Sequence, residues 1–399
     1  MVPLPVMPSP PSSGFASRTA MRKAPPVHTT PTPRAAVRRR RSPLLTAVVA
    51  TIIASLVLVP SAAQAVQSLP AQNAGGALQR YLTTHDHHFH TVFDGTEFPD
   101  YGLTLDGVIA MDAAGVGDAE SARATTFVAN NIGSYVGTGT ESYAGATAKA
   151  LLVSLSQGRT PKGFLGGLNL LARLKARQTA TGQFKDKSQF GDFSNTITQS
   201  LAVAALRKAG QSLGTKAIPF LANGQCPNGG FRLALSVNQC SDNTKADSDA
   251  TSFAVQGLLS GSQTSAVKTR ISRAIGYLKT QMDAEGGVKG AGPTNTPNSN
   301  STGLAVLAFD TTGHPDLATK GRLFLRSLTY TCAFPAPMRG AVAYDPARFA
   351  TADGQGNAAT LTDQDLRATT QATLGFAPVP LYKVTNVGAK TSAPAFTCP

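Results

Sequence analysis

Residues 225–261 read QCPNGGFRLALSVNQCSDNTKADSDATSFAVQGLLSG, and this stretch decides the fold. It holds, in order, a Gln, a Gly-Gly turn followed by Phe231, a loop bounded by two cysteines, an acidic helix start, an apolar helix and a final Gly261. Shortened versions of this order recur along the chain. The sequence therefore predicts a repeat protein built from helices.

Glycines that end apolar helical stretches give the period of the repeat. Such glycines suit the left-handed position just past the end of a helix. Successive spacings are 43, 52, 51 and 52 residues, and a sixth glycine follows after 62 more, at Gly115, Gly158, Gly210, Gly261, Gly313 and Gly375. A near-constant spacing of this length indicates a repeat architecture.

Residues that cap helix N-termini precede each of these apolar stretches. Asn195, Asp247 and Asn298 stand at similar distances before their helices, and Asp100, Ser142 and Thr362 occupy comparable places. Their side chains can accept hydrogen bonds from free backbone N–H groups. The helices that they open consist mostly of Ala, Leu, Val, Gly and Ser, which favours an inner, closely packed layer.

A second set of helices is expected between the apolar ones. The stretch 264–282 is amphipathic, with Val267, Ile271, Ile275 and Leu278 on one face and basic or polar residues on the other, as in a helix that faces water. The expected outer helices are 72–84, 119–134, 163–178, 215–222, 264–282 and 316–329. Six inner and six outer helices predict an all-α protein, an α6/α6 toroid of two concentric rings with six repeats of about fifty residues.

The turns between outer and inner helices carry a family resemblance. Gln225, Gly229, Gly230 and Phe231 form Q-x-x-x-G-G-F, and variants of the pattern begin at Gln178 (with Gly182 and Phe184) and Gln281 (with Gly286, Gly287 and Val288). This resembles the repeat of prenyltransferases, squalene cyclases and related α/α-toroid proteins. The resemblance implies that the Gln ties down a glycine turn and that the aromatic residue fills the gap between helices.

The catalytic motifs of that superfamily are incomplete in this chain. Class II terpene cyclases use an acidic D-x-D-D motif, whereas residues 247–250 read DSDA. The chain has no Trp and only 26 Phe and Tyr residues, too few for a rich aromatic lining that stabilises cations. No Asp, Cys and His set matches the zinc site of protein prenyltransferases. A likeness in fold does not carry an activity with it.

The first 65 residues predict a secretory leader of bacterial type. They contain eight basic residues and no Asp or Glu, then an apolar run at 44–59, then Ala63-Gln64-Ala65 before the cleavage point. An uncleaved N-terminal membrane anchor is the alternative, and translation starts at either Met1 or Met21. Without the leader the net charge falls from +14 to +6, which does not favour nucleic-acid binding.

The expected organisation is a leader (1–65), a toroid domain (66–380) and a C-terminal tail (381–399) pinned by a disulfide. Four cysteines in an exported chain indicate two disulfides, for which three pairings exist. The short loop that it closes favours Cys226–Cys240, and hence Cys332–Cys398. Zinc binding is the weaker alternative, because the chain contains no CxxC pair. We expect a monomer.

Three groups of residues are candidate sites. Asp247 and Asp249 are a possible general acid or cation contact, or simply helix caps. The cluster His85, His87, His88 and His90 is a candidate metal site or a polar loop. A rim of polar residues at the end of the ring where the inner helices begin is the candidate ligand site: Asp100, Tyr101, Tyr143, Asp192, Asp247, Asn298, Asn300 and Asp365.

Our first interpretation of the sequence is an exported toroid that binds a small apolar or amphipathic molecule, or a cofactor, and does not transform it. The sequence does not identify that cofactor. The resemblance extends to the cobalamin-binding α-domains of transcobalamin-like proteins, although no β-domain to close over such a ligand is evident here. The alternatives are a terpene cyclase-like enzyme that uses Asp247 or Asp249, and a glycan-acting enzyme with paired carboxylates.

Overall fold

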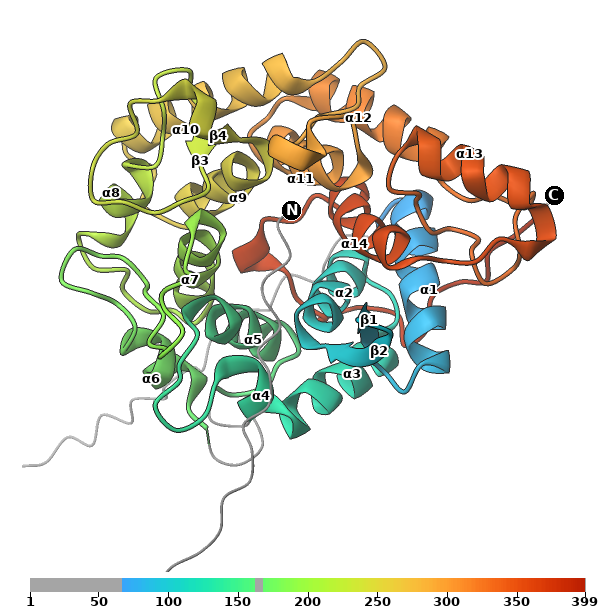
Figure 1. Cartoon of the computed structure of the whole chain (residues 1–399), viewed down its shortest axis with the longest axis horizontal. Coiled ribbons are helices and arrows are strands. Elements are labelled where there is room, and N and C mark those ends of the chain that lie inside the picture. The colour runs from blue at the N-terminus through green and yellow to red at the C-terminus, as the bar shows by residue number, and fades with distance from the viewer. Residues whose placement is uncertain (1–66, 162–167, 399) are drawn as a thin grey trace, which may run out of the picture. The chain divides into compact units, whose positions relative to one another are not determined.

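The computed structural model describes residues 67–161 and 168–398, which form one unit of helices in two concentric rings (Figure 1). The expected leader and its apolar run lie outside the described residues. Across the described ranges, no helix combines the length and the apolar character needed to cross a membrane.

The inner ring is closed. Each of its helices packs against the next, and the last packs against the first. Within the described residues the inner ring consists of α2 (Tyr101–Ala114), α5 (Ala144–Ser156), α7 (Thr196–Lys208), α9 (Ser248–Leu259), α11 (Ser299–Thr311) and α14 (Asp363–Phe376). All six apolar helices predicted from the sequence are confirmed.

The outer ring also follows the prediction, with different bounds. In the described part of the chain it consists of α1 (Leu69–Thr84), α3 (Asp118–Asn130) with the short α4 (Ile132–Val136), α6 (Leu170–Lys175), α8 (Ala217–Ala222), α10 (Ser265–Gln281) and α12 (Pro315–Ser327). Asn131 divides the predicted helix 119–134 into α3 and α4. The predicted helix 163–178 is reduced to α6, with residues 162–167 outside the description. The α6/α6 toroid is therefore confirmed.

The glycines that mark the repeat have two different roles. Four of them have the left-handed backbone expected past a helix end, with φ of +66° at Gly115, Gly158 and Gly210 and +81° at Gly313. Gly375 instead lies inside α14, where a Cβ atom would come within 3.2 Å of the Cα atom of Gly303 in α11. Gly261 likewise has no positive φ. The predicted role is thus wrong for these last two positions, where glycine permits close packing.

The glycine turn is a contact between successive repeats. Gly229 has φ +96°, and a Cβ atom there would lie 2.3 Å from the carbonyl oxygen of Arg273 in the next outer helix. The same arrangement recurs at Gly182, Gly286 and Gly340, where a Cβ atom would lie 2.3 to 2.5 Å from a backbone carbonyl oxygen of the following outer helix. Gly340 was not predicted. Its partner is Asn73 of α1, so this turn joins the last repeat to the first.

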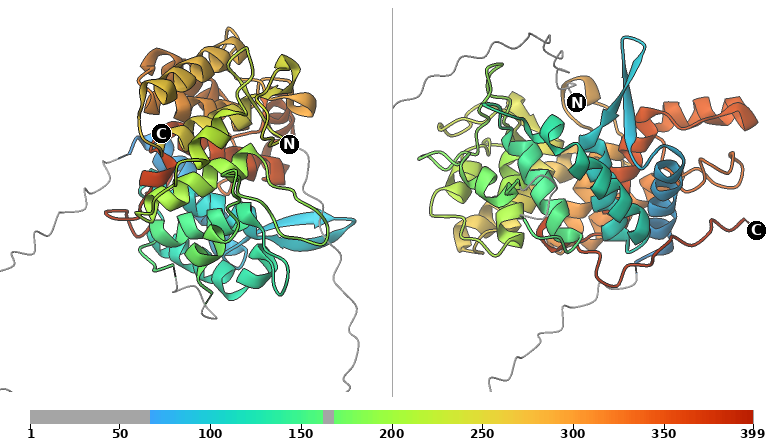
Figure 2. Two further views of the ribbon diagram at one scale, coloured as in Figure 1. Left: turned by 90° about the vertical axis from the view of Figure 1, so that its left-hand side faces the viewer. Right: turned by 90° about the horizontal axis from the view of Figure 1, so that it is seen from below.

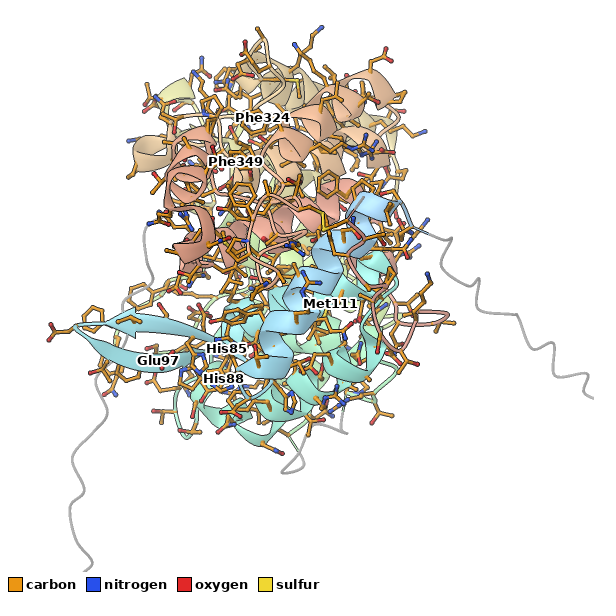
Figure 3. The ribbon with its side chains drawn as sticks, turned by 90° about the vertical axis from the view of Figure 1, so that its right-hand side faces the viewer. His85, His88, Glu97, Met111, Phe324 and Phe349 are labelled. Atoms are coloured by element: carbon orange, nitrogen blue, oxygen red, sulfur yellow. A yellow bond between two sulfur atoms is a disulfide. The ribbon has the colours of Figure 1, made fainter. Side chains whose placement is uncertain are left out.

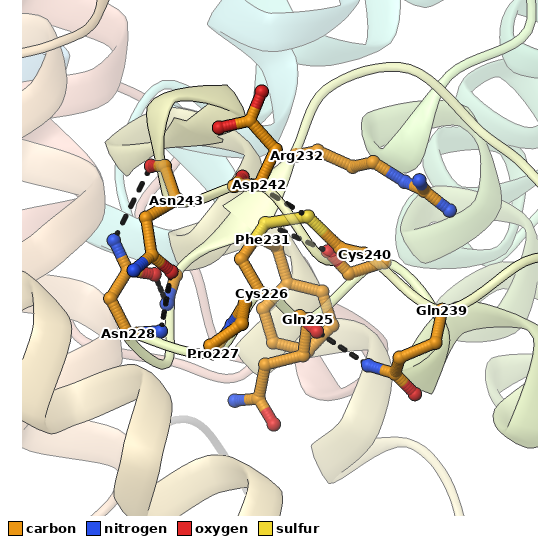
Figure 4. The surroundings of a disulfide bond; sticks show 12 residues. Gln225, Cys226, Pro227, Asn228, Phe231, Arg232, Gln239, Cys240, Asp242 and Asn243 are labelled. Carbon is orange, nitrogen blue, oxygen red and sulfur yellow. Dashed lines mark hydrogen bonds between the residues drawn. A yellow bond between two sulfur atoms is a disulfide. The ribbon is translucent and has the colours of Figure 1, made fainter.

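The Gln that the family resemblance implies acts as expected at Gln225, whereas Gln178 makes one longer bond, to the carbonyl oxygen of Leu213 (3.4 Å). The buried Gln225 side chain donates to the carbonyl oxygens of Gly229 (2.9 Å) and Arg270 (2.8 Å), and Phe231 beside it is fully buried (Figure 4). Gln281 reaches only the hydroxyl of Thr280. In the turn at Gly182, the amide of Gln199 from the inner helix α7 donates to the glycine carbonyl (2.9 Å).

Several smaller elements were not predicted. A β-hairpin, β1 (Phe89–Phe93) and β2 (Thr96–Asp100), pairs Phe89 with Asp100 and projects from the ring just before α2 (Figure 2). A two-residue ladder joins β3 (Phe231–Arg232) to β4 (Ala246–Asp247). Helix α13 (Pro346–Gln355) lies in the long segment before α14. Short 3-10 turns occur at η2 (Asn243–Lys245), η3 (Gly292–Thr294), η4 (Gly356–Ala358) and η5 (Leu381–Lys383).

Both predicted disulfides are present. Cys226–Cys240 closes the loop between the glycine turn and α9 (Figure 4), and Cys332–Cys398 ties the C-terminus to the segment after α12. All four cysteines are therefore bonded, which leaves no cysteine thiolate for zinc.

The C-terminal segment covers the end of the ring where the inner helices finish. The carbonyl oxygens of Ser156 at the end of α5 and of Gly115 after α2 accept from the amides of Asn386 (3.0 Å) and Lys390 (2.9 Å). The η5 turn packs against α7, and Leu381 and Val384 are buried. Figure 2 shows this segment on the face opposite the hairpin. The tail is thus an integral part of the barrel and not only an appendage held by a disulfide.

Candidate functional site

The end of the ring where the inner helices begin, here called the mouth, is built from capping side chains. Asp100 Oδ1 accepts from Leu103 N (2.8 Å) and Asp247 Oδ1 from Ala250 N (2.7 Å). The side chain of Asn298, which is fully buried, likewise caps α11. These three predicted rim residues therefore organise helix starts.

Four other predicted rim residues are engaged elsewhere. Tyr101 stacks on Phe127, and the Tyr143 hydroxyl contacts Glu141. Asp192 accepts hydrogen bonds from backbone amides of its own exposed loop. Asp365 is fully buried, 2.8 Å from the guanidinium of Arg348 and 3.0 Å from the Tyr330 hydroxyl. These contacts show what holds the four side chains, and their role in binding a ligand stays a prediction.

Each inner helix has one row of residues, here called a stripe, that is not packed against another helix. Most of these residues are partly exposed, and the others are buried. Residues on the other sides are buried against the outer ring or against neighbouring inner helices, so this stripe faces the axis of the ring. Its members recur every four residues within a helix, as one helical face requires. The inward stripe comprises Asp106, Lys149, Ile197, Leu201, Asp249, Phe253, Asn300, Leu304, Asp363, Arg367 and Gln371.

Asp249 and Asn300 are the two predicted site residues that belong to the inward stripe. Sequence reasoning missed Asp106, Lys149, Arg367 and Gln371. A signal was present at the first two, because Asp106 in LTLDGVIAM and Lys149 in TAKALL each interrupt an apolar stretch, although Asp112 in the same helix as Asp106 is buried. A charge inside a buried helix marks the side that is not packed against protein.

Two ion pairs form a charged wall on one side of the axis. Lys149 Nζ of α5 lies 2.7 Å from Asp106 of α2, and Arg367 of α14 lies 2.5 Å from Asp100 at the start of α2. Water still reaches the first pair, because 35% of the Asp106 side chain and 17% of the Lys149 side chain are exposed. Burial opposes the charge of Lys149, but Asp106 prevails and raises the pKa of Lys149 to about 12.

The side chains of α7 and its neighbour α9 make an apolar wall. Ile197 and Leu201 of α7 lie on the inward stripe, as does Phe253, one turn after Asp249 in α9. Leu304 of α11 continues this surface. The inward stripe is therefore amphipathic around the ring, charged at α2, α5 and α14 and apolar at α7.

Burial raises the pKa of each carboxyl group on the inward stripe, those of Asp106, Asp249 and Asp363, and the shift is large at Asp249. Burial, and then the neighbouring Asp247 carboxylate, raise the pKa of Asp249 to about 6, although the Ser301 hydroxyl opposes the shift. Asp249 Oδ1 is buried and accepts no hydrogen bond of standard geometry, although the Ser301 hydroxyl, which is itself without a partner, lies close to this carboxyl group. The Asp249 side chain forms no ion pair within the described residues. The group can hold or release a proton under mildly acidic conditions.

The histidine cluster lies at the base of the hairpin, where Figure 3 shows His85 and His88, with Glu97 farther out along the hairpin. His87 Nδ1 lies 2.6 Å from Glu120 Oε1, His85 stacks on Tyr81, and His88 stacks on Phe127. The rings of His88 and His90 also contact each other (centroids 4.1 Å apart), and His90 Nδ1 lies 3.5 Å from Glu97 Oε1. The parts of the chain that the structure describes contain no group of three or more His, Cys, Asp or Glu side chains arranged to hold a metal ion.

Solved structures with this fold come from different enzyme classes. Similar structures are type II terpene cyclase MstE from Scytonema (TM-score 0.54, 11% identity, covering 77% of this chain and 96% of that chain) and unsaturated glucuronyl hydrolase from Bacillus sp. GL1 (0.53, 10%, 76% and 95%). A protein from Actinoplanes is also similar (0.51, 13%, 77% and 99%). No family model matches the sequence, and no curated protein sequence matches it. At these identities the likeness establishes the α/α-toroid fold.

Proposed function

We propose that this chain is an exported toroid protein that binds a small amphipathic molecule along the inward stripe, at the mouth of the ring, and does not transform it. The amphipathic character of that stripe carries the proposal. The paired charges at α2, α5 and α14 would orient the polar end of a ligand, and Ile197, Leu201 and Phe253 would cover its apolar part. Because the C-terminal segment covers the opposite end, the ligand would enter at the mouth.

Binding without catalysis is favoured by how the charges are arranged. Asp106 and Asp100 are each already engaged by a cation, so neither is free to exchange a proton or attack a substrate. The position of the last Asp of the D-x-D-D motif is occupied by the fully buried Ala250. The same fold hosts both a terpene cyclase and a glycan hydrolase, so it does not itself favour an activity.

Export is supported by two features of the chain. The order of basic residues, apolar run and Ala63-Gln64-Ala65 is that of a secretory leader, and disulfides persist in oxidising compartments. The rest of the proposal follows the sequence hypothesis: a monomer that binds no nucleic acid and has no stable membrane insertion after cleavage.

The proposal is tested by native mass spectrometry of the protein secreted into its own culture medium, recorded before and after denaturation. We expect an additional mass that denaturation releases, and fragmentation of that species would give its chemical class. A protein that carries no ligand, and that also takes up none from a panel of amphiphiles, would contradict the binding function. The same spectra give the cleavage site.

A second candidate function is acid catalysis by Asp249. The observation in its favour is a carboxyl group with a raised pKa and an unpartnered oxygen, one turn from Phe253. Such an acid could protonate an alkene. Incubation with squalene at pH 5.5, followed by product analysis, tests this function. A cyclised product that Asp249→Asn abolishes, with the fold retained, would establish an enzyme. Unchanged substrate would exclude this reaction.

The glycan-acting alternative receives less support. Glycoside hydrolysis needs two carboxyl groups that face the same bond. On the inward stripe, Asp106 is held by Lys149, and at the mouth Asp247 is occupied as a helix cap. The remaining carboxyl group of the stripe, Asp363, lies on α14, which α11 separates from the helix of Asp249.

A further inference from the structure

Three buried acceptor oxygens without hydrogen-bond partners lie on the inward stripe. They are Asp249 Oδ1 of α9, Asn300 Oδ1 of α11 and Gln371 Oε1 of α14, and they belong to three successive helices of the inner ring (Figure 1). Asn300 is only 7% exposed. Buried polar atoms are nearly always hydrogen-bonded in folded proteins, and each exception calls for an explanation.

Close helix packing relates two of these acceptors, those of α11 and α14. A Cβ atom on Gly303 of α11 would lie 2.3 Å from the backbone oxygen of Gln371 in α14, so the two helices touch through their backbones at this level. Asn300 precedes Gly303 by one turn. On the other side of α11, Ser301 lies close enough to Asp249 to influence its pKa. We call Asp249, Asn300 and Gln371 the acceptor wall.

The charge balance of the mouth also favours a cationic group. Five carboxyl groups, those of Asp100, Asp106, Asp247, Asp249 and Asp363, lie at the mouth or on the inward stripe, together with two cations, Lys149 and Arg367. The two cations are engaged by Asp106 and Asp100. Asp249 is therefore a carboxyl group for which residues 67–161 and 168–398 supply no ion-pair partner. Burying an uncompensated charge is costly, and a ligand cation would remove that cost.

We propose that the acceptor wall binds the protonated primary amine of an amphipathic ligand whose apolar chain lies along Phe253 and Leu304. An ammonium group has three N–H donors and no acceptor, which matches three acceptor oxygens. A hydroxyl group has a single donor and leaves two oxygens unsatisfied, and a carboxylate is repelled by Asp249. This inference rests on the ligand-binding function proposed above and names the class of its ligand.

The experiment compares three probes with the same chain length on the mature protein, residues 66–399, stripped of bound amphiphile. Dodecylammonium, 1-dodecanol and dodecanoate are titrated by calorimetry at pH 7.5, the two ionic probes below their micelle concentrations and dodecanol below its solubility limit. We expect dodecylammonium to bind roughly 10- to 100-fold more tightly than dodecanol, because hydrogen bonds to a charged group are stronger than neutral ones. Dodecanoate should bind most weakly.

Two variants assign the effect to the acceptor wall. Asp249→Asn keeps the shape of the side chain and should bring dodecylammonium to the affinity of dodecanol. Asn300→Leu removes one acceptor at similar volume and should weaken dodecylammonium roughly 5-fold while leaving dodecanol unchanged. Asp316→Asn, an exposed change on the outer helix α12, is the matched control and should change nothing.

The outcomes separate this inference from the function on which it rests. If all three probes bind with equal affinity, the ammonium assignment is overturned and the binding function stands. If dodecylammonium is preferred but Asp249→Asn and Asn300→Leu both leave that preference intact, the acceptor wall is not its site. If none of the probes binds, both the assignment and the binding function of this stripe are contradicted.

Discussion

Gly303 of α11 and Gly375 of α14 meet backbone to backbone, because a Cβ atom on Gly375 would lie 3.2 Å from the Cα atom of Gly303. No side chain separates the two inner helices at this point. The contact holds Asn300 and Gln371 on the same wall of the ring. Close packing of two helices therefore positions a candidate binding site whose residues are 71 positions apart in the sequence.

The first prediction concerns this contact. Gly303→Ala places a Cβ atom 2.3 Å from the Gln371 carbonyl oxygen, which forces the two helices apart. We expect the free energy of unfolding to fall by about 1–3 kcal/mol, as for other overpacked cores. Urea denaturation at pH 7 measures the change.

A matched control for Gly303→Ala exists in the outer ring. Gly276 lies inside α10, and a Cβ atom there would meet nothing within 4 Å. Gly276→Ala should raise the free energy of unfolding by about 0.5–1 kcal/mol, because Ala is the better helix former. Equal effects of the two substitutions would contradict the packing argument.

The second prediction concerns Asp249 and pH. Because its pKa is raised to about 6 in the folded protein, the folded state binds more protons than the unfolded state between about pH 4 and pH 6. The Asp249 carboxyl group therefore contributes to the free energy of unfolding at low pH, and this contribution is lost as the pH rises through 6. Asp249→Asn removes the charge, so at pH 7.5 the variant should be more stable than the wild type by about 1–3 kcal/mol.

The gain in Asp249→Asn should shrink as the pH approaches 4, where the wild-type carboxyl group is protonated. Urea denaturation of both proteins at several pH values gives the difference. Burial also raises the pKa of Asp112 to about 6, but that group is common to both proteins and cancels. A gain that does not depend on pH would show that the buried charge is not its cause.

The third prediction concerns the glycine turn. The Gln225 amide serves the carbonyl oxygens of Gly229 and Arg270. One repeat later its place in the β-bridge is taken by Met282, and the adjacent Gln281 side chain donates to the Thr280 hydroxyl. Gln225→Leu should lower the free energy of unfolding by about 2–4 kcal/mol, because both carbonyl groups lose a donor. Gln281→Leu should lower the free energy of unfolding by less than about 0.5 kcal/mol, because Gln281 is partly exposed. Thermal and urea unfolding of the two variants give the comparison.

The fourth prediction compares the two disulfides. Cys332–Cys398 spans 66 residues and Cys226–Cys240 spans 14. A disulfide stabilises the folded state by lowering the entropy of the unfolded chain. On this basis, replacing Cys332 and Cys398 by serine should lower the free energy of unfolding by about 4 kcal/mol, and replacing Cys226 and Cys240 should lower it by about 3 kcal/mol. Loss of the longer link should also speed hydrogen exchange at the amides of Asn386 and Lys390, which bind the ends of α5 and α2. Unchanged exchange there would mean that the tail is held without its disulfide.

Local sequence signals predicted a large part of this protein. Asn195, Asp247 and Asn298 cap the helices that they were expected to open, because capping acts between residues two or three positions apart. The alternation of apolar and amphipathic stretches predicted the two rings, since each ring buries a different fraction of the helix surface. The cysteine pairing followed from the short loop between Cys226 and Cys240.

The candidate site was predicted only in part, because its contacts join residues that the chain keeps far apart. Lys149 and Asp106 are 43 positions apart, and Arg367 and Asp100 are 267 apart. Asp365 and Asp363 are both acidic residues in the first turn of α14, yet Asp365 is buried against Arg348 and Tyr330 whereas Asp363 lies on the inward stripe. Composition and spacing do not say which side of a helix is left unpacked.

The sequence by itself therefore determined the period, the helix starts, the two rings and the disulfides of this protein. These depend on side chains that act on their own turn of helix, or on an apolar pattern that repeats. Closure of the ring decided the rest: the fourth glycine turn that joins Gly340 to Asn73, the tail across the far end, and the acceptor wall. The physical reason is that a closed ring brings its first and last repeats into contact, and the residues that face its axis are those that no neighbouring helix covers.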